Sequence, residues 1–95
     1  MSRFSSRIII TVIGKDKVGI IATVSNTCAH FGANILDISQ TVLQEYFTMI
    51  MFVDISDLTT GGFSDFSEAL KNEGEKHNVD IRVMHEDIFN AMHRI

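Results

Sequence analysis

The sequence predicts an α+β fold of the ferredoxin-like βαββαβ kind, a four-stranded antiparallel sheet with two helices on one face. Two observations carry this prediction. Hydrophobic periodicity changes twice from that of a strand to that of a helix and back, and the two strand–helix–strand units meet at a short hairpin. Right-handed crossovers then put both helices on the same face. The 95 residues are expected to form one domain, with a core over about residues 7–86 and a short tail at 87–95.

The first unit begins with a β-branched run, residues 7–13 (RIIITVI), which predicts a strand that ends at Gly14. Beyond the following loop, the apolar residues recur with the period of a helix, in one stripe: Ile21, Val24, Cys28 and Phe31. Gly32 follows the last of them, where a left-handed C-cap belongs. Asp16 is the expected N-cap of this helix.

The second unit repeats the order after a hairpin at residues 44–45. The elements expected here are strands over 34–43, 46–55 and 79–85 and a helix over about 64–77. The run Thr-Thr-Gly-Gly at 59–62 is the clearest break before that helix. Gly74 costs stability inside a helix, so its presence predicts a close approach to the sheet. The tail is expected to form one or two helical turns.

Two of the predicted strands carry large apolar side chains on both faces. Such strands usually have both faces covered. No predicted segment remains to cover the second face, so a second copy of the chain is expected there, either by stacking of sheets or by joining of edges. The residues on which this homodimer expectation depends are Ile9, Ile13, Ile50 and Phe52 on one face and Phe47, Met49 and Met51 on the other.

Composition narrows the class of partner. The formal net charge is -4 and Lys and Arg do not cluster, so neither nucleic acid nor an anionic membrane is an expected partner. The single cysteine, Cys28, excludes an internal disulfide and fits a reducing compartment. The N-terminal MSRFSSR lacks the features of a signal peptide, and the apolar runs are too short to span a membrane. A soluble cytoplasmic domain is expected.

Residues that could carry catalysis or hold a metal are scattered along the chain. The histidines have no i, i+4 pair and no short ligand spacing: His30, His77, His85 and His93. Cys28 is isolated on the first predicted helix, and no nucleophile can be paired with a base. We therefore expect no catalytic residue, no metal, no cofactor and no enzymatic activity.

The loop at residues 14–19 (GKDKVG) has the two glycines that open a phosphate-binding P-loop. Gly19 is followed by Ile20 and Ile21, which can neither reach a phosphate nor hold magnesium, and Asp16 replaces the second glycine of a dinucleotide-binding motif. A loop that enters a helix still offers N–H groups to an anion such as a carboxylate. The alternative, that Gly14 and Gly19 only permit a tight turn and close packing, stays open.

Three of the polar residues in the second strand could have a functional role. Asp37 and Gln40 fall on opposite faces by parity, as they would in an edge strand with solvated positions. Asn34 begins the strand and could be a turn residue after Gly32. We expect the start of this strand at the same end of the sheet as the loop, so that Asn34 and Asp16 face one cleft.

The loop GKDKVGI at 14–20, GANI at 32–35 and EYFTM at 45–49 together resemble an ACT domain. More closely, the chain is similar to the stand-alone ACT proteins of the UPF0237 group, and through them to the ACT halves of the glycine cleavage system transcriptional repressor. The resemblance covers residues 8–92, nearly the whole chain.

This resemblance implies a regulatory domain that binds an amino acid at the interface between two paired copies. The loop amides would take the ligand carboxylate, and Asp16 or Asn34 would hold its ammonium group. The ligand-binding residues it implies are Gly14, Asp16, Lys17, Val18, Gly19, Ile20, Asn34, Ile35 and Asp37. Lys15 and Lys17 crowd charge around the loop, so a ligand other than a free amino acid stays open. The alternative function is a dimerisation or protein-interaction module that regulates a partner enzyme or transcription factor without a ligand.

Overall fold

Four strands and three helices make up the described part of a computed structural model, residues 6–15 and 19–92. In chain order they are β1 Arg7–Gly14, α1 Ile20–Phe31, β2 Asn34–Leu43, β3 Tyr46–Asp54, α2 Phe63–His77, β4 Asp80–His85 and α3 Glu86–Met92. The predicted βαββαβ order is confirmed, with boundaries within one or two residues of those expected. The helical turns expected in the tail form α3.

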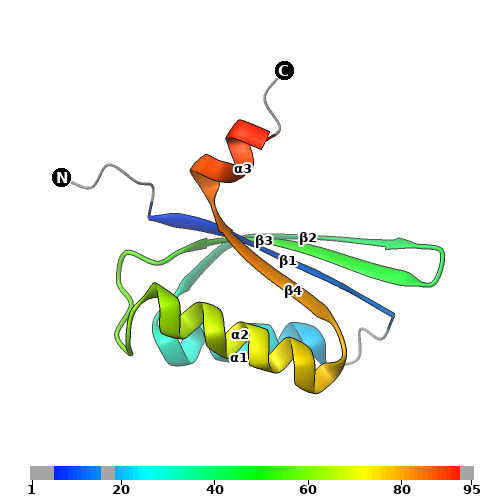
Figure 1. Cartoon of the computed structure of the whole chain (residues 1–95), viewed down its shortest axis with the longest axis horizontal. Coiled ribbons are helices and arrows are strands. Elements are labelled where there is room, and N and C mark those ends of the chain that lie inside the picture. The colour runs from blue at the N-terminus through cyan, green and yellow to red at the C-terminus, as the bar shows by residue number, and fades with distance from the viewer. Residues whose placement is uncertain (1–5, 16–18, 93–95) are drawn as a thin grey trace.

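The sheet has the strand order β2-β3-β1-β4, and each neighbouring pair is antiparallel. β1 lies inside the sheet between β3 and β4, while β2 forms one edge (Figure 1). Arg7 lies opposite Asp54 and Gly14 lies opposite Phe47. The sheet therefore has two ends, which we call the Arg7 end and the Gly14 end.

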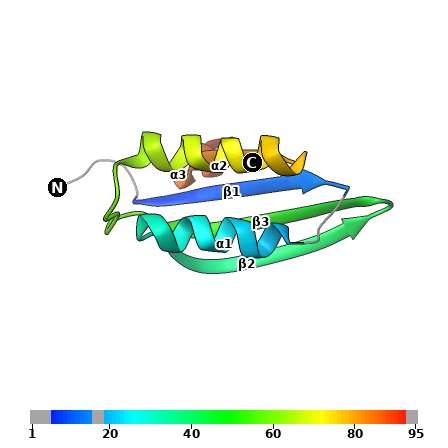
Figure 2. The same ribbon diagram turned by 90° about the horizontal axis from the view of Figure 1, so that it is seen from below.

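The molecule is layered, with α1 and α2 side by side on one face of the sheet, which we call the helix face (Figures 1 and 2). This confirms the prediction from right-handed crossovers. α3 lies on the opposite, open face (Figure 1). Among the described residues no helix is long and apolar enough to cross a membrane.

The main core lies between the sheet and the two helices. Alternate residues of each central strand point to the helix face, as the two-residue period of a strand requires. The fully buried side chains of this core include Ile8, Ile10, Val12, Met49, Met51 and Val53 from the strands and Val24, Phe66 and Leu70 from the helices. Burial of each such side chain contributes about 1.5–3 kcal/mol to the stability of the folded state. The packing of the two helices on this face of the sheet is therefore the main source of that stability.

Gly74 and Gly32 have the roles expected from the sequence. A Cβ atom at Gly74 would lie 2.9 Å from the carbonyl oxygen of Val79 and 3.1 Å from Cγ1 of Ile81. α2 therefore approaches β4 more closely than any larger residue allows. Gly32 has a φ of 79° and ends α1 in the left-handed conformation.

The expectation that no part of the chain covers the second face is wrong. α3 packs over the Arg7 end of the open face, where the Phe89 and Phe52 rings meet edge to face with centroids 6.4 Å apart. Beneath them Ile9 has no exposed surface. Arg7 and Glu86 form an ion pair of 3.5 Å at the start of α3. Toward the Gly14 end of the same face, Ile13 stays 44% exposed.

Candidate functional site

The loop between β1 and α1 ends at Gly19, which is the N-cap of α1 with a φ of 76°. The prediction that Asp16 caps this helix is therefore wrong; Asp16, Lys17 and Val18 themselves lie outside the described residues. No side chain of the described residues caps α1, because a glycine occupies the N-cap. The first N–H groups of α1 consequently present the positive end of the helix dipole near the Gly14 end of the sheet.

Gly14 is a packing residue. A Cβ atom placed on it would overlap Cγ1 of Val79 and lie 3.0 Å from Cβ of Val79. The loop therefore leaves the sheet directly against the turn between α2 and β4. This supports the reading of Gly14 as a requirement of close packing and fixes where the loop begins.

Lys15 is turned toward the hairpin between β2 and β3. Its ammonium group lies 3.8 Å from Oε1 of Glu45 and 5.7 Å from the centre of the Tyr46 ring. Both charged side chains are well exposed, so this ion pair contributes little to stability. Its position nevertheless directs the Lys15 charge to the hairpin.

Asn34 lies at the opposite end of the sheet from the loop. Asn34 is opposite Asp54 on β3, whereas Gly14 is opposite Phe47. These two β3 residues are seven positions apart, or roughly 23 Å at the rise of a strand. The expectation that Asn34 and the loop face one cleft of the same chain is wrong, because α1 runs back along the sheet and delivers the chain to the Arg7 end.

The other predicted residues of β2 lie along a sheet edge. Asp37 is on the open face and Gln40 on the helix face, which confirms the parity argument. The register shifts between Ile35 and Asp37, and Oδ1 of Asp37 accepts a 2.9 Å hydrogen bond from the backbone N–H of Ile38. Asp37 thus has a local role at a β-bulge, while Ile35 is half-buried on the helix face.

β2 and the adjacent side of α1 form a surface that we call the edge surface. Ile38 and Val42 point to the helix face, yet 37% and 59% of their surfaces are exposed. The α1 sequence IIATVSNTCAHF contains no Asp, Glu, Lys or Arg. Exposed surface helices usually carry charges on their outer side, whereas the cores of protein interfaces are depleted of charge. The absence of charged residues from α1 is readable in the sequence.

Several titratable groups stay outside this arrangement. His30 and His77 are exposed, and His85 is half-buried against the Phe63 ring at 4.8 Å; His93 lies outside the described residues. Cys28 is buried in the core, and burial raises the pKa of its thiol to about 11. Over residues 6–15 and 19–92, no group of three or more His, Cys, Asp or Glu side chains is placed to hold a metal ion.

The sequence model of the ACT domain matches residues 6–84. A UPF0237 protein of Clostridium perfringens is 54% identical over 87 residues, which cover 92% of this chain and 97% of that protein. Among solved structures, an ACT domain protein from Streptococcus pneumoniae is 46% identical, with a TM-score of 0.73 over 87% of this chain and 92% of that one.

A more distant structure shares the fold alone. A chain assigned as a glycine cleavage system transcriptional repressor is 22% identical, with a TM-score of 0.71 over 83% of this chain and 44% of that chain. The resemblance inferred from the loop, from GANI and from the hairpin is thereby confirmed. The chain belongs to the ACT domain family, a family of regulatory domains, and its curated relatives are UPF0237 proteins.

Proposed function

We propose that this ACT domain is a regulatory protein that binds an amino acid and acts as a homo-oligomer, with the ligand held between two copies. One observation carries the proposal. The two parts of the predicted ligand site, the start of α1 and the start of β2, lie at opposite ends of one sheet. A single chain therefore cannot bring them together, but two chains can.

An antiparallel pairing of β2 with β2 of a second copy would bring these parts together. As the edge strand of the sheet, β2 offers a row of main-chain N–H and C=O groups over ten residues. A two-fold axis through this edge reverses the direction of the partner strand, as isologous pairing requires. The partner's Asn34 would then lie beside the Gly14 end of the first copy.

The edge surface supports this mode of pairing over stacking of the sheets. Ile38 and Val42 are exposed apolar side chains on the helix face, and the neighbouring α1 carries no formal charge besides that of His30 when protonated. The outer helix α2 differs, since six of its fifteen residues are Asp, Glu or Lys. Charge depletion on one side of the molecule fits a protein interface there.

The chemistry of the proposed site suits a zwitterion. The N–H groups at the start of α1 would donate to the ligand carboxylate. The side-chain oxygen of the partner's Asn34 would accept a hydrogen bond from the ligand ammonium group, with Asp16 as a second acceptor. The remaining residues proposed to line the site are Gly14, Lys17, Val18, Gly19, Ile20, Ile35 and Asp37.

A thermal-shift screen against the twenty amino acids tests the ligand. Binding to the native state alone stabilises it by roughly 2.7 kcal/mol at a hundredfold excess over Kd. Asn34→Ala should abolish the shift, whereas Asn90→Ala on the exposed surface of α3 serves as a matched control and should retain it. If no amino acid shifts the melting temperature and a partner protein co-purifies, the alternative function as a protein-interaction module is favoured.

Charge placed on the edge surface tests the assembly. Ile38→Lys with Val42→Lys puts two ammonium groups on the helix face of β2 and should yield a monomer that no longer binds the amino acid. The control is Ser39→Lys with Thr41→Lys, which adds the same charge to the same strand on the open face. Sedimentation velocity distinguishes the two, and a dimeric Ile38→Lys/Val42→Lys variant would contradict edge pairing.

A further inference from the structure

A second candidate site lies on the outer side of the helix layer, away from the loop and from β2. An open groove of about 520 Å³ runs between α1 and α2. Its lining residues are Thr23, Asn26, Thr27, His30 and Phe31 from α1 and Ala69, Asn72 and Glu73 from α2. Most of the lining residues have short side chains, which leaves space between the two helices.

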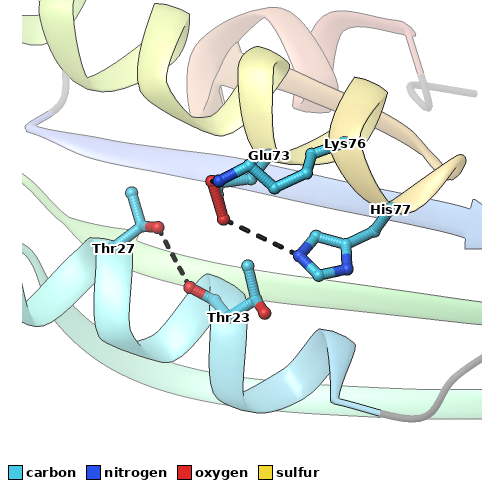
Figure 3. A network of polar contacts seen from close by, with 5 residues as sticks. All are labelled: Thr23, Thr27, Glu73, Lys76 and His77. Carbon is cyan, nitrogen blue, oxygen red and sulfur yellow. Dashed lines mark hydrogen bonds and ion pairs between the residues drawn. The ribbon is translucent and has the colours of Figure 1, made fainter.

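The middle of the groove offers unused hydrogen-bonding groups. The hydroxyl of Thr27 is already used, because it donates to the carbonyl oxygen of Thr23 at 3.0 Å (Figure 3). The carboxamides of Asn26 and Asn72 are different, since within residues 6–15 and 19–92 neither has a hydrogen-bond partner. Each carboxamide provides two donors and one acceptor oxygen. The two groups come from two helices and line the same groove.

One end of the groove is formed by a carboxylate whose charge is already balanced. Oε2 of Glu73 lies 3.3 Å from Nζ of Lys76, and Oε1 lies 3.8 Å from Nε2 of His77. Figure 3 shows the Glu73 side chain between these residues of α2 and the threonines of α1. A cationic ligand would have to compete with Lys76 for this carboxylate. The groove therefore has no strong preference for either sign of charge.

The other end is aromatic and rigid. The His30 and Phe31 rings meet edge to face with centroids 5.3 Å apart. Phe31 is anchored in the core by a contact with Phe66, whose ring centroid is 5.4 Å away. Phe31 keeps 9% of its surface exposed, and this part of a fixed ring can contact a flat ligand without losing side-chain freedom on binding.

We propose that the groove between α1 and α2 binds an uncharged small molecule that joins a carboxamide-like group to a flat ring. The carboxamide pairs with the side chains of Asn26 and Asn72, and the ring packs against His30 and Phe31. The groove is shallow, so a fragment of about ten heavy atoms should bind with a Kd on the order of 1–10 mM. The proposal does not depend on the amino-acid site.

Three small aromatic ligands of different charge test it: benzamide, benzoate and benzylamine. In ¹H–¹⁵N spectra of the full chain, benzamide should shift the side-chain NH₂ signals of Asn26 and Asn72 in a saturable manner. Benzoate and benzylamine should bind roughly fivefold or more weakly, a difference of about 1 kcal/mol. Benzamide should also shift the backbone amide signals of the lining residues Thr27 and Ala69. The double variant Asn26→Leu/Asn72→Leu should lose these backbone shifts, and the control Asn90→Leu should keep them.

Any one of three results would overturn the proposal: equal binding of the three ligands, benzamide shifts centred outside the groove, or shifts that do not saturate. Asn34→Ala separates this proposal from the proposed function. That variant should lose the amino acid and keep benzamide, so either site can fail without the other.

Discussion

Replacing Gly14 by alanine tests whether the loop is set by packing against Val79. The new Cβ atom would overlap Cγ1 of Val79 and lie 3.0 Å from its Cβ. Gly14 itself is buried at the end of β1, so its backbone cannot move away from Val79 without disturbing the sheet. Overpacking of this kind costs about 1–3 kcal/mol. For a domain of this size, that corresponds to a decrease in Tm of about 4–24 °C.

A double-mutant cycle between Gly14 and Val79 is the control for this measurement of stability. Val79→Ala removes Cγ1 and should relieve part of the overlap, while the Cβ atom at 3.0 Å keeps the fit tight. Urea unfolding of the parent, the two single variants and Gly14→Ala/Val79→Ala should therefore give a coupling energy of about 0.5–2 kcal/mol, with the double variant more stable than additivity predicts. Additive losses, or a Gly14→Ala variant as stable as the parent, would refute the packing role of Gly14.

Three further substitutions probe the core and the open face. Gly74→Ala should destabilise the fold by about 1–3 kcal/mol in urea unfolding, because the new Cβ would lie 2.9 Å from the Val79 carbonyl oxygen. Replacing glycine by alanine inside a helix usually increases stability instead, so a gain in stability would contradict this contact. Phe89→Ala should lower the free energy of unfolding by about 1–2 kcal/mol. It should also expose Phe52, which new binding of an apolar dye would detect. Unchanged dye binding would mean that α3 does not cover the sheet. Burial raises the pKa of the Cys28 thiol from 9.0 to about 11, so the unfolded chain loses this proton at lower pH than the native one. Stability should be retained below pH 9.0 and fall toward pH 11 by about 2–3 kcal/mol, and the difference in unfolding free energy between the parent and Cys28→Ala should show this slope.

The order of the helices and strands was predictable because the pattern of apolar residues distinguishes them clearly. The β-branched run at 7–13 indicates a strand by its composition. The stripe through Val24, Cys28 and Phe31 has the period of a helix, and all three residues are buried in the core. The start of α1 was less predictable, since Asp16 has the chemistry of an N-cap while Gly19 has the backbone conformation. A propensity for capping cannot decide between two loop residues when the loop geometry is unknown.

The cover of the open face was missed for a different reason. The tail was expected to be helical, but its short length gave no indication that Phe89 would fold back onto Phe52. Contacts between distant segments depend on the direction in which β4 delivers the chain, which periodicity does not encode. The need for a second copy on this face is correspondingly smaller than the sequence suggested.

The candidate site was predicted in its parts and misplaced as a whole. The loop and Asn34 were selected on chemistry and on the ACT resemblance, yet the register separates them by most of the sheet. A correct topology would have shown this, because a strand that follows a crossover helix starts where the previous strand started. The uncharged sequence of α1 is a feature of the sequence that supports the proposed pairing at the edge surface.

Complementation between two inactive variants tests the central claim most directly. Asp16→Ala and Asn34→Ala should each fail to bind the amino acid found in the screen. If each site takes its loop from one copy and its Asn34 from the other, mixing the two variants restores one intact site in every mixed dimer. Random exchange of subunits makes half of the dimers mixed, so titration calorimetry should recover about a quarter of the parent's sites at the parent's affinity. A mixture that binds no more than its separate components, after exchange has been verified by mass spectrometry, would contradict a ligand site shared between two copies.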